Sequence, residues 1–130
     1  MILVDTHVVV WLAFEQARIS KPAREAIDAA RRHENGLAIC DITLLEISTL
    51  AARGRIQVDT TLESFLLDVE RRFVVLPITA GACARIQSLP TAYPRDPADR
   101  IIAATALAEG IPLLTADREI RRSKVLHTIW

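Results

Sequence analysis

The chain of 130 residues carries sixteen Lys and Arg side chains and sixteen Asp and Glu side chains, so its formal net charge is zero. No global field therefore marks nucleic acid or a membrane as the partner, and either one would have to bind at a local patch. The length is most simply one domain, residues 1–130, which can bury a core without disulfides or a structural metal.

Cysteine usage and hydropathy indicate an intracellular protein. Cys40 and Cys83 lie in apolar surroundings and far from any Cys-x-x-Cys spacing. We expect both to be buried thiols in a reducing cytosol rather than a disulfide or a zinc site. The longest purely apolar run, 8–14, is far below the roughly 18 residues that span a membrane, and no basic leader precedes the first strand. The sequence predicts a soluble, unexported, cytoplasmic protein with no membrane partner.

The first half of the chain alternates short apolar runs with helical spacing of apolar residues, which predicts alternating strands and helices. Asn35 and Gly36 are expected to close the second helix, and Gly54 the third. In chain order, the expected elements are a strand at 2–4, a helix at 6–14, a helix that opens at 20, a strand at 37–40 and a helix that starts at 43.

The second half continues this alternation without a repeat or a linker. Thr60 or Thr61 is expected to cap its first helix. The expected elements are a helix at 62–72, a strand at 73–78, a short helix at 79–89, a helix at 97–109, a strand at 111–114, a charged turn or helix at 118–124 and a terminal edge strand at 125–129.

The helix expected at 97–109 has the clearest end signals. Asp96 can accept hydrogen bonds from the free first-turn amides, and Pro97 loses no hydrogen bond at the first helical position. Asp99 falls in the first turn, and Gly110 can adopt a left-handed conformation just past the end. Because the middle of this helix is apolar on nearly every face, we expect it to pack against a sheet.

Four acidic residues lie just after an expected strand or in the first turn of a helix: Asp5, Glu46, Asp99 and Asp117. Each has a structural explanation; Asp5 can cap a helix, and Glu46 is in capping-box register with Thr43. However, the alternation indicates a parallel α/β sheet, whose carboxyl edge would bring all four together. Four carboxylates repel, so the cluster needs protonation or a hard divalent cation such as Mg²⁺ or Mn²⁺. We expect a metal site rather than four independent caps.

Other catalytic motifs are missing from the sequence. It contains no Gly-rich phosphate loop or Gly-x-Ser-x-Gly elbow, and its three histidines have no ligand spacing. A phosphoaspartate receiver would need an acceptor Asp at the end of the strand 73–78, where the chain reads Leu-Pro-Ile-Thr. A haloacid-dehalogenase-like phosphatase would need a second Asp where the chain has His7.

The acidic motifs together resemble those of the PIN-domain ribonucleases, and among them the VapC-type toxins of bacterial toxin–antitoxin pairs. The resemblance covers nearly the whole chain. The similar segments are LVDTHVVVWL with Asp5, TLLEIS with Glu46, DRIIAATALAEG with Asp99 and LLTADREI with Asp117. Thr6 and Thr115 are expected to support the acids. The Arg-Gly-Arg at 53–55 and the Asp-Pro-Ala-Asp-Arg at 96–100 resemble one bacterial subgroup.

The resemblance implies a three-layer α/β/α sandwich with a five-stranded parallel sheet. It also implies an endoribonuclease with RNA as substrate, Mg²⁺ or Mn²⁺ as cofactor and a small antitoxin protein as inhibitor, in homodimers or a heterotetramer with the antitoxin. The alternative is a catalytically silent PIN-fold module that acts only by binding a protein partner.

The residues suggest how such an enzyme would work. Asp5 and Asp99 would be the main metal ligands, and Glu46 would bind through water or act as the base. Asp117 would complete the site or bind a second metal. Asp96, three residues before Asp99, could also be the third ligand, but the capping geometry assigns Asp96 to the backbone amides and Asp99 to the metal.

Basic residues flank the acidic motifs at Arg95, Arg100, Arg118 and Arg121. They either hold RNA phosphates or form ordinary solvated surface. Phosphate contacts of this kind would position the strand without reading its bases, so they do not identify the RNA.

Overall fold

The computed structural model describes residues 1–33 and 36–130. Its strands form one five-stranded parallel sheet in the order β3-β2-β1-β4-β5. The strands are β1 (Ile2–Val4), β2 (Leu37–Cys40), β3 (Val74–Leu76), β4 (Leu113–Leu114) and β5 (Thr128–Ile129). The expected five-stranded parallel sheet is therefore confirmed, with the first strand of the chain at its centre.

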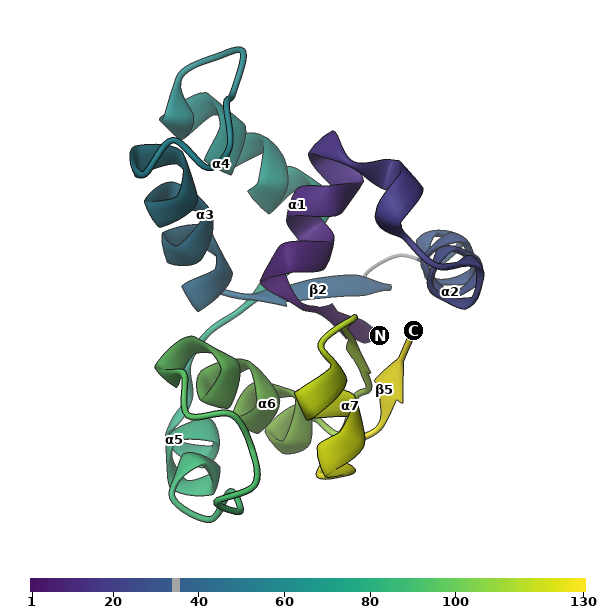
Figure 1. Ribbon diagram of the computed structural model, residues 1–130, viewed down its shortest axis with the longest axis vertical. Helices are drawn as coiled ribbons and strands as arrows, with labels where there is room; N and C mark the ends of the chain where they lie inside the picture. Colours follow the sequence, from purple (N-terminus) through teal and green to yellow (C-terminus); the bar gives the residue numbers. More distant parts are fainter. Residues whose placement is uncertain (34–35) are drawn as a thin grey trace.

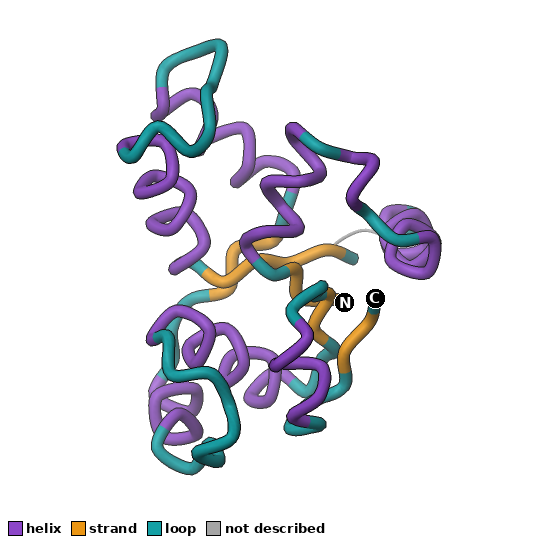
Figure 2. Tube along the Cα trace, viewed as in Figure 1, coloured by secondary structure: helices purple, strands orange, loops and turns teal. Residues whose placement is uncertain are grey.

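Helices cover both faces of the sheet, and the strands lie between the two groups (Figures 1 and 2). One face carries α1 (Thr6–Phe14), the short 3-10 helix η1 (Gln16–Arg18), α2 (Lys21–Arg31), α3 (Ile42–Ala52) and α4 (Leu62–Arg72). The other face carries α5 (Ala80–Ile86), α6 (Pro97–Glu109) and α7 (Arg118–Ser123). This arrangement confirms the three-layer α/β/α sandwich.

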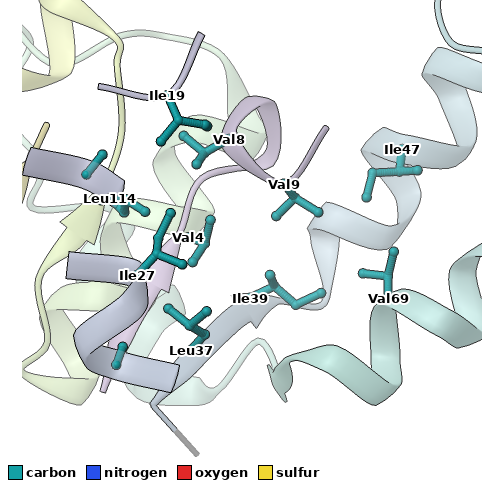
Figure 3. Close-up of a cluster of buried hydrophobic side chains, with 12 residues drawn as sticks. Val4, Val8, Val9, Ile19, Ile27, Leu37, Ile39, Ile47, Val69 and Leu114 are labelled. Atoms are coloured by element: carbon teal, nitrogen blue, oxygen red, sulfur yellow. The ribbon is translucent and has the colours of Figure 1, made fainter. Parts of the chain in front are cut away.

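Two apolar clusters, one on each face, join the sheet to these helices. Val4, Ile39 and Leu114 pack with the helices of the first group (Figure 3), whereas Leu3 and Leu113 pack beneath α6. All five side chains are fully buried. Successive strand residues point to opposite faces, which explains why the strands are continuously apolar rather than alternating. Each such side chain contributes roughly 2 kcal/mol by leaving water.

The C-terminal strands are shorter than expected. β4 begins at Leu113 and not at Ile111, because Pro112 has no amide hydrogen to donate to the sheet. The Pro112 carbonyl still accepts from the Leu3 amide at 3.0 Å. β5 is confined to Thr128–Ile129, although it is an edge strand as expected. No helix in the described ranges is long and apolar enough to cross a membrane.

Two expectations about individual residues were wrong. Cys83 is exposed on the short outer helix α5, whereas Cys40 is buried in β2 as expected. Gly36 does not close the second helix, because α2 already ends at Arg31; Asn35 lies outside the described residues. A Cβ atom on Gly36 would lie 1.9 Å from the Ala30 carbonyl oxygen, so this glycine permits a close backbone approach.

Candidate active site

Asp5 is fixed at the carboxyl end of the central strand by neighbours on both sides. Its side chain is buried and caps α1, with Oδ1 accepting from the Thr6 amide at 2.9 Å. Its Oδ2 accepts from the Thr115 hydroxyl at 2.7 Å, at the end of the adjacent strand β4. Asp5 therefore caps α1 through Oδ1 and is joined to the end of β4 through Oδ2.

His7 adds a contact to Asp5 that the sequence did not indicate. Its Nε2 accepts from the Ala116 amide at 3.1 Å, so the ring proton of the neutral imidazole sits on Nδ1. Nδ1 lies 3.5 Å from Asp5 Oδ2. Histidine spacing in the sequence could not reveal this role, because the partner is a backbone amide from the other end of the chain.

Glu46 is anchored to α1 through a hydroxyl relay. The Thr6 hydroxyl donates to Glu46 Oε1 at 2.5 Å and lies 3.0 Å from the Thr43 hydroxyl. Since Thr6 has one hydroxyl proton and gives it to Glu46, Thr43 must be the donor in the second bond. Burial raises the pKa of Glu46, the Thr6 bond lowers it, and the charges of Asp5 and Asp96 raise it further.

The capping box predicted for Thr43 and Glu46 is wrong. α3 begins at Ile42, one residue earlier than expected, with Asp41 at the N-cap position. Thr43 therefore lies inside the first turn, fully buried, and its hydroxyl faces Thr6 rather than a backbone amide. The Glu46 side chain is consequently free of any capping role and lies on the wall of a cleft.

At the start of α6, Asp96 caps the helix as predicted. Asp96 Oδ2 accepts from the Asp99 amide at 3.1 Å, and Pro97 occupies the first helical position. The pKa of Asp99 is raised from 3.8 to about 7, chiefly by burial and then by the charges of Asp5, Asp96, Glu46 and Asp117. The charged form of Asp99 is thus disfavoured first by burial and then by its acidic neighbours.

Asp117 follows β4 and caps the next helix. Its Oδ1 accepts from the Ile120 amide at 3.0 Å, and its own amide donates to the Thr115 hydroxyl at 3.1 Å. Thr115 is fully buried and thereby links Asp117 to Asp5. The structure thus contains the hydroxyl partnership expected for Thr115, while Asp117 combines a capping role with a charge that reaches Asp99.

Four acids open onto one cleft of about 640 Å³, which is lined by residues of α1, α3 and α6. Figure 1 shows how these three helices are arranged at the edge of the sheet. Asp5, Glu46, Asp96 and Asp99 all line the cleft, whereas Asp117, the fourth acid expected at this site, is not among its described lining residues. This volume is that of a typical ligand site. Residues from separate parts of the sequence therefore meet at the carboxyl edge of the sheet, where parallel α/β folds bind ligands.

The arginines that the sequence suggested for RNA binding lie elsewhere. Within the described ranges, the cleft lining includes none of Arg95, Arg100, Arg118 and Arg121. Arg100 donates to the Tyr93 carbonyl at 3.2 Å and so holds the loop before α6. Arg53 and Arg55, which sequence proximity to the acids did not single out, line the cleft instead.

Tyr93 lies beneath the site and is only 1% exposed. Its hydroxyl has no hydrogen-bond partner among the described residues. Burial raises its pKa strongly, and the charges of Asp5, Asp99 and Asp117 raise it further. The loop before α6 therefore keeps a neutral phenol close to the acidic cluster.

The donor set suits a hard divalent cation. As the side chains stand, no group of three or more His, Cys, Asp or Glu residues in the described ranges is arranged to hold a metal ion. The cleft nevertheless presents carboxylate oxygens from several elements, which are the ligands that Mg²⁺ and Mn²⁺ prefer. The repulsion that raises the pKa of Asp99 is also what a bound cation would relieve.

Comparison with known proteins agrees with this fold. The PIN domain family matches residues 2–126, and the chain therefore belongs to that family. It is 37% identical to Ribonuclease VapC22 of Mycobacterium tuberculosis (strain ATCC 25618 / H37Rv) over 131 residues, which cover 99% of this chain and 98% of the relative.

Solved structures of toxin–antitoxin proteins share the fold. VapBC2 of Rickettsia felis, bound to a DNA fragment from its promoter, superposes with a TM-score of 0.73 at 19% identity over 98% of this chain and 97% of that chain. DNA-bound VapBC of Salmonella typhimurium gives 0.67 at 20% identity, over 98% and 95%. A toxin–antitoxin complex from Klebsiella pneumoniae gives 0.62 at 25% identity, over 90% and 87%.

Proposed function

We propose that this protein is a metal-dependent endoribonuclease that hydrolyses RNA phosphodiester bonds and serves as the toxin of a type II toxin–antitoxin pair. The observation that carries the proposal is the single cleft into which α1, α3 and α6 bring Asp5, Glu46 and Asp99. Membership of the PIN domain family and 37% identity to a protein named a ribonuclease support RNA as the substrate.

The proposed cofactor is Mg²⁺ or Mn²⁺, held by Asp5, Glu46 and Asp99 with Asp117 at the margin. Such an ion, when bound, lowers the pKa of water and stabilises charge on the phosphate oxygens. Asp5 is the best prepared of these ligands, because Thr6 and Thr115 already fix its orientation. Asp96 caps α6 through Oδ2 and is proposed as a helix cap rather than as a ligand, an assignment that substitution of Asp96 and Asp99 tests.

Hydrolysis adds water across the bond between phosphorus and the 3′ oxygen. The water oxygen bonds to phosphorus, one water proton is removed, and the 3′ oxygen leaves and takes a proton. Glu46 is the proposed proton acceptor, because burial raises its pKa and the Thr6 hydroxyl holds one of its oxygens in place. The other oxygen of Glu46 is the one proposed to take the proton.

The proposed inhibitor is a small antitoxin protein, with the toxin in homodimers or in a heterotetramer with it. The chain carries exposed apolar side chains near the cleft and beside a groove of about 850 Å³ between α1 and α4, notably Leu45 at 61% and Phe14 at 42% exposure. An antitoxin could cover these side chains and place a basic group among the acids, where a guanidinium pairs well with carboxylates. Pull-down with the product of the adjacent gene, and growth arrest on expression of the chain alone, test this partnership.

Cleavage assays with and without chelator test the enzymatic proposal. Purified protein should cut single-stranded or loop RNA in Mg²⁺ or Mn²⁺, should stop in excess EDTA and should recover when metal is restored. Undiminished cleavage in EDTA would contradict the metal dependence. RNA left intact under every metal condition would favour the silent binding module.

A further inference from the structure

Two positive side chains share the cleft with the acids. Arg53 is the C-cap residue of α3, Arg55 follows two residues later, and both line the same cleft as Asp5, Glu46 and Asp99. Among the described residues that line this cleft, they are its only Lys or Arg side chains. The cleft is therefore divided into an acidic part and a cationic part at the end of α3.

Hydrogen bonds fix the backbone that carries these two arginines at the end of α3. Gly54 has a left-handed φ of 69°, its amide donates to the Ala51 carbonyl at 3.1 Å, and the Arg55 amide donates to the Leu50 carbonyl at 2.9 Å. This pattern is the glycine-based closure common at helix C-termini. It fixes the backbone on both sides of Gly54, so the two guanidinium groups extend from defined points.

Within residues 1–33 and 36–130, no ion pair uses the charge of either arginine. Both residues are exposed, and the side-chain ion pairs of the described ranges involve Arg18, Arg72 and His7 instead. Their position at the negative end of the α3 dipole favours cations in this place without neutralising them. They are available for an anion that enters the cleft from solvent.

We propose that Arg53 and Arg55 bind backbone phosphates of the RNA next to the bond that is cut, and thereby orient the strand across the acidic part of the cleft. This assignment rests on the proposed ribonuclease function. A polyanion suits the cleft because one phosphate can reach the metal-binding acids while a neighbouring phosphate meets the arginines. A basic protein segment laid along the whole cleft would pair with the acids but would be repelled by the arginines.

The proposal replaces a weaker expectation from the sequence. Arg118 and Arg121 are close to an acid along the chain, but they lie on α7 and do not line the cleft in the described structure. Arg53 and Arg55 are more distant from the acids in sequence, yet the fold brings them into the same cleft. The two sets of arginines therefore make different predictions about which substitutions weaken RNA binding.

The test compares the double substitution Arg53→Ala/Arg55→Ala with Arg85→Ala, an exposed arginine on α5 that does not line the cleft. In Mg²⁺ the double variant should raise KM by roughly tenfold or more with a smaller change in kcat, whereas Arg85→Ala should match the parent. Arg53→Lys/Arg55→Lys should recover part of the affinity. Thermal melting verifies that every variant is folded.

Binding without cleavage gives a second readout. In an Asp99→Asn background, affinity for a short fluorescent single-stranded RNA is measured across a salt series. Removing one arginine that binds a phosphate should reduce the slope of log affinity against log salt by about 0.7. If the wild-type protein does not cleave RNA, the proposed ribonuclease function is wrong. The dependence of RNA affinity on salt would still show whether the arginines bind phosphates.

An unchanged KM and an unchanged slope in the double variant, beside an active parent, would overturn the arginine assignment and leave the ribonuclease intact. Loss of antitoxin capture with unchanged RNA binding would overturn it as well, by assigning the pair to the protein partner. The slope of log affinity against log salt could instead fall for Arg118→Ala/Arg121→Ala and not for Arg53→Ala/Arg55→Ala. That result would support the RNA-binding residues expected from sequence proximity.

Discussion

Asp99 is the residue whose ionisation should control the stability of the metal-free protein. Its pKa is about 7 in the folded chain against an ordinary value of 3.8. The folded state therefore holds this proton more tightly than the unfolded state does between these two values. By linkage, the free energy of unfolding must fall as the pH rises through that window.

Chemical denaturation in EDTA at several pH values measures this effect. We expect the stability contributed by protonated Asp99 to be fully present below pH 3.8 and to be lost as the pH rises through about 7. Asp99→Asn should flatten this decline, because an amide does not titrate. A decline that is equally steep in the variant would assign the effect to other groups.

Asp96 and Asp99 should respond differently to substitution. Asp96→Ala removes the cap that accepts from the Asp99 amide and should cost about 1 kcal/mol of stability while leaving much of the RNA cleavage. Asp99→Asn should abolish cleavage with little loss of stability. Paired melting and cleavage assays compare the two proteins. An active Asp99→Asn protein beside an inactive but stable Asp96→Ala protein would reverse the assignment.

Tyr93 offers a test of the buried phenol beneath the site. Its hydroxyl is buried without a hydrogen-bond partner in the described structure, so Tyr93→Phe removes an unsatisfied polar atom and leaves the ring. We expect stability to stay the same or rise by about 1 kcal/mol in denaturant titrations. A clear loss of stability would show that the hydroxyl is hydrogen-bonded in solution.

At the scale of elements, predictions from sequence succeeded where a local signal decides the structure. Asp96, Pro97 and Gly110 set the ends of α6 as expected, because capping depends on neighbouring residues alone. The start of α3 was misplaced, because the Thr43 hydroxyl is claimed by Thr6 from another helix. Cys83 was misjudged because helix α5 packs only its other side, including the buried Ala82, against the protein.

Two glycines make a matched test of packing between elements. Gly36→Ala would place a Cβ 1.9 Å from the Ala30 carbonyl oxygen, so the backbone must move and stability should fall by about 3 kcal/mol. Gly81→Ala is the control, because its nearest neighbour would be 3.8 Å away and alanine favours the helix by roughly 0.5–1 kcal/mol. Equal melting temperatures for the two variants would contradict the close contact at Gly36.

At the scale of the molecule, the central feature is the carboxyl edge of one parallel sheet. The order of strands and helices allowed the meeting of Asp5, Glu46 and Asp99 to be predicted, because the topology rule needs only that order. The Thr115 bond to Asp5 was not predicted, because it depends on β4 lying beside β1 in the sheet. The contacts of His7 and the position of Arg53 and Arg55 in the cleft could not be predicted in this way, because they depend on three-dimensional packing between distant segments.

The most direct measurement of the central claim is the rate of RNA cleavage by wild-type protein and by Asp5→Asn, purified side by side and assayed in Mg²⁺. Asp5→Asn keeps a side-chain oxygen that can accept from the Thr6 amide, but it removes the negative charge of this buried cleft residue. We predict that the wild type cuts RNA and that the folded variant is slower by on the order of a hundredfold or more. Equal rates for the two proteins would show that the cleavage does not come from this cleft.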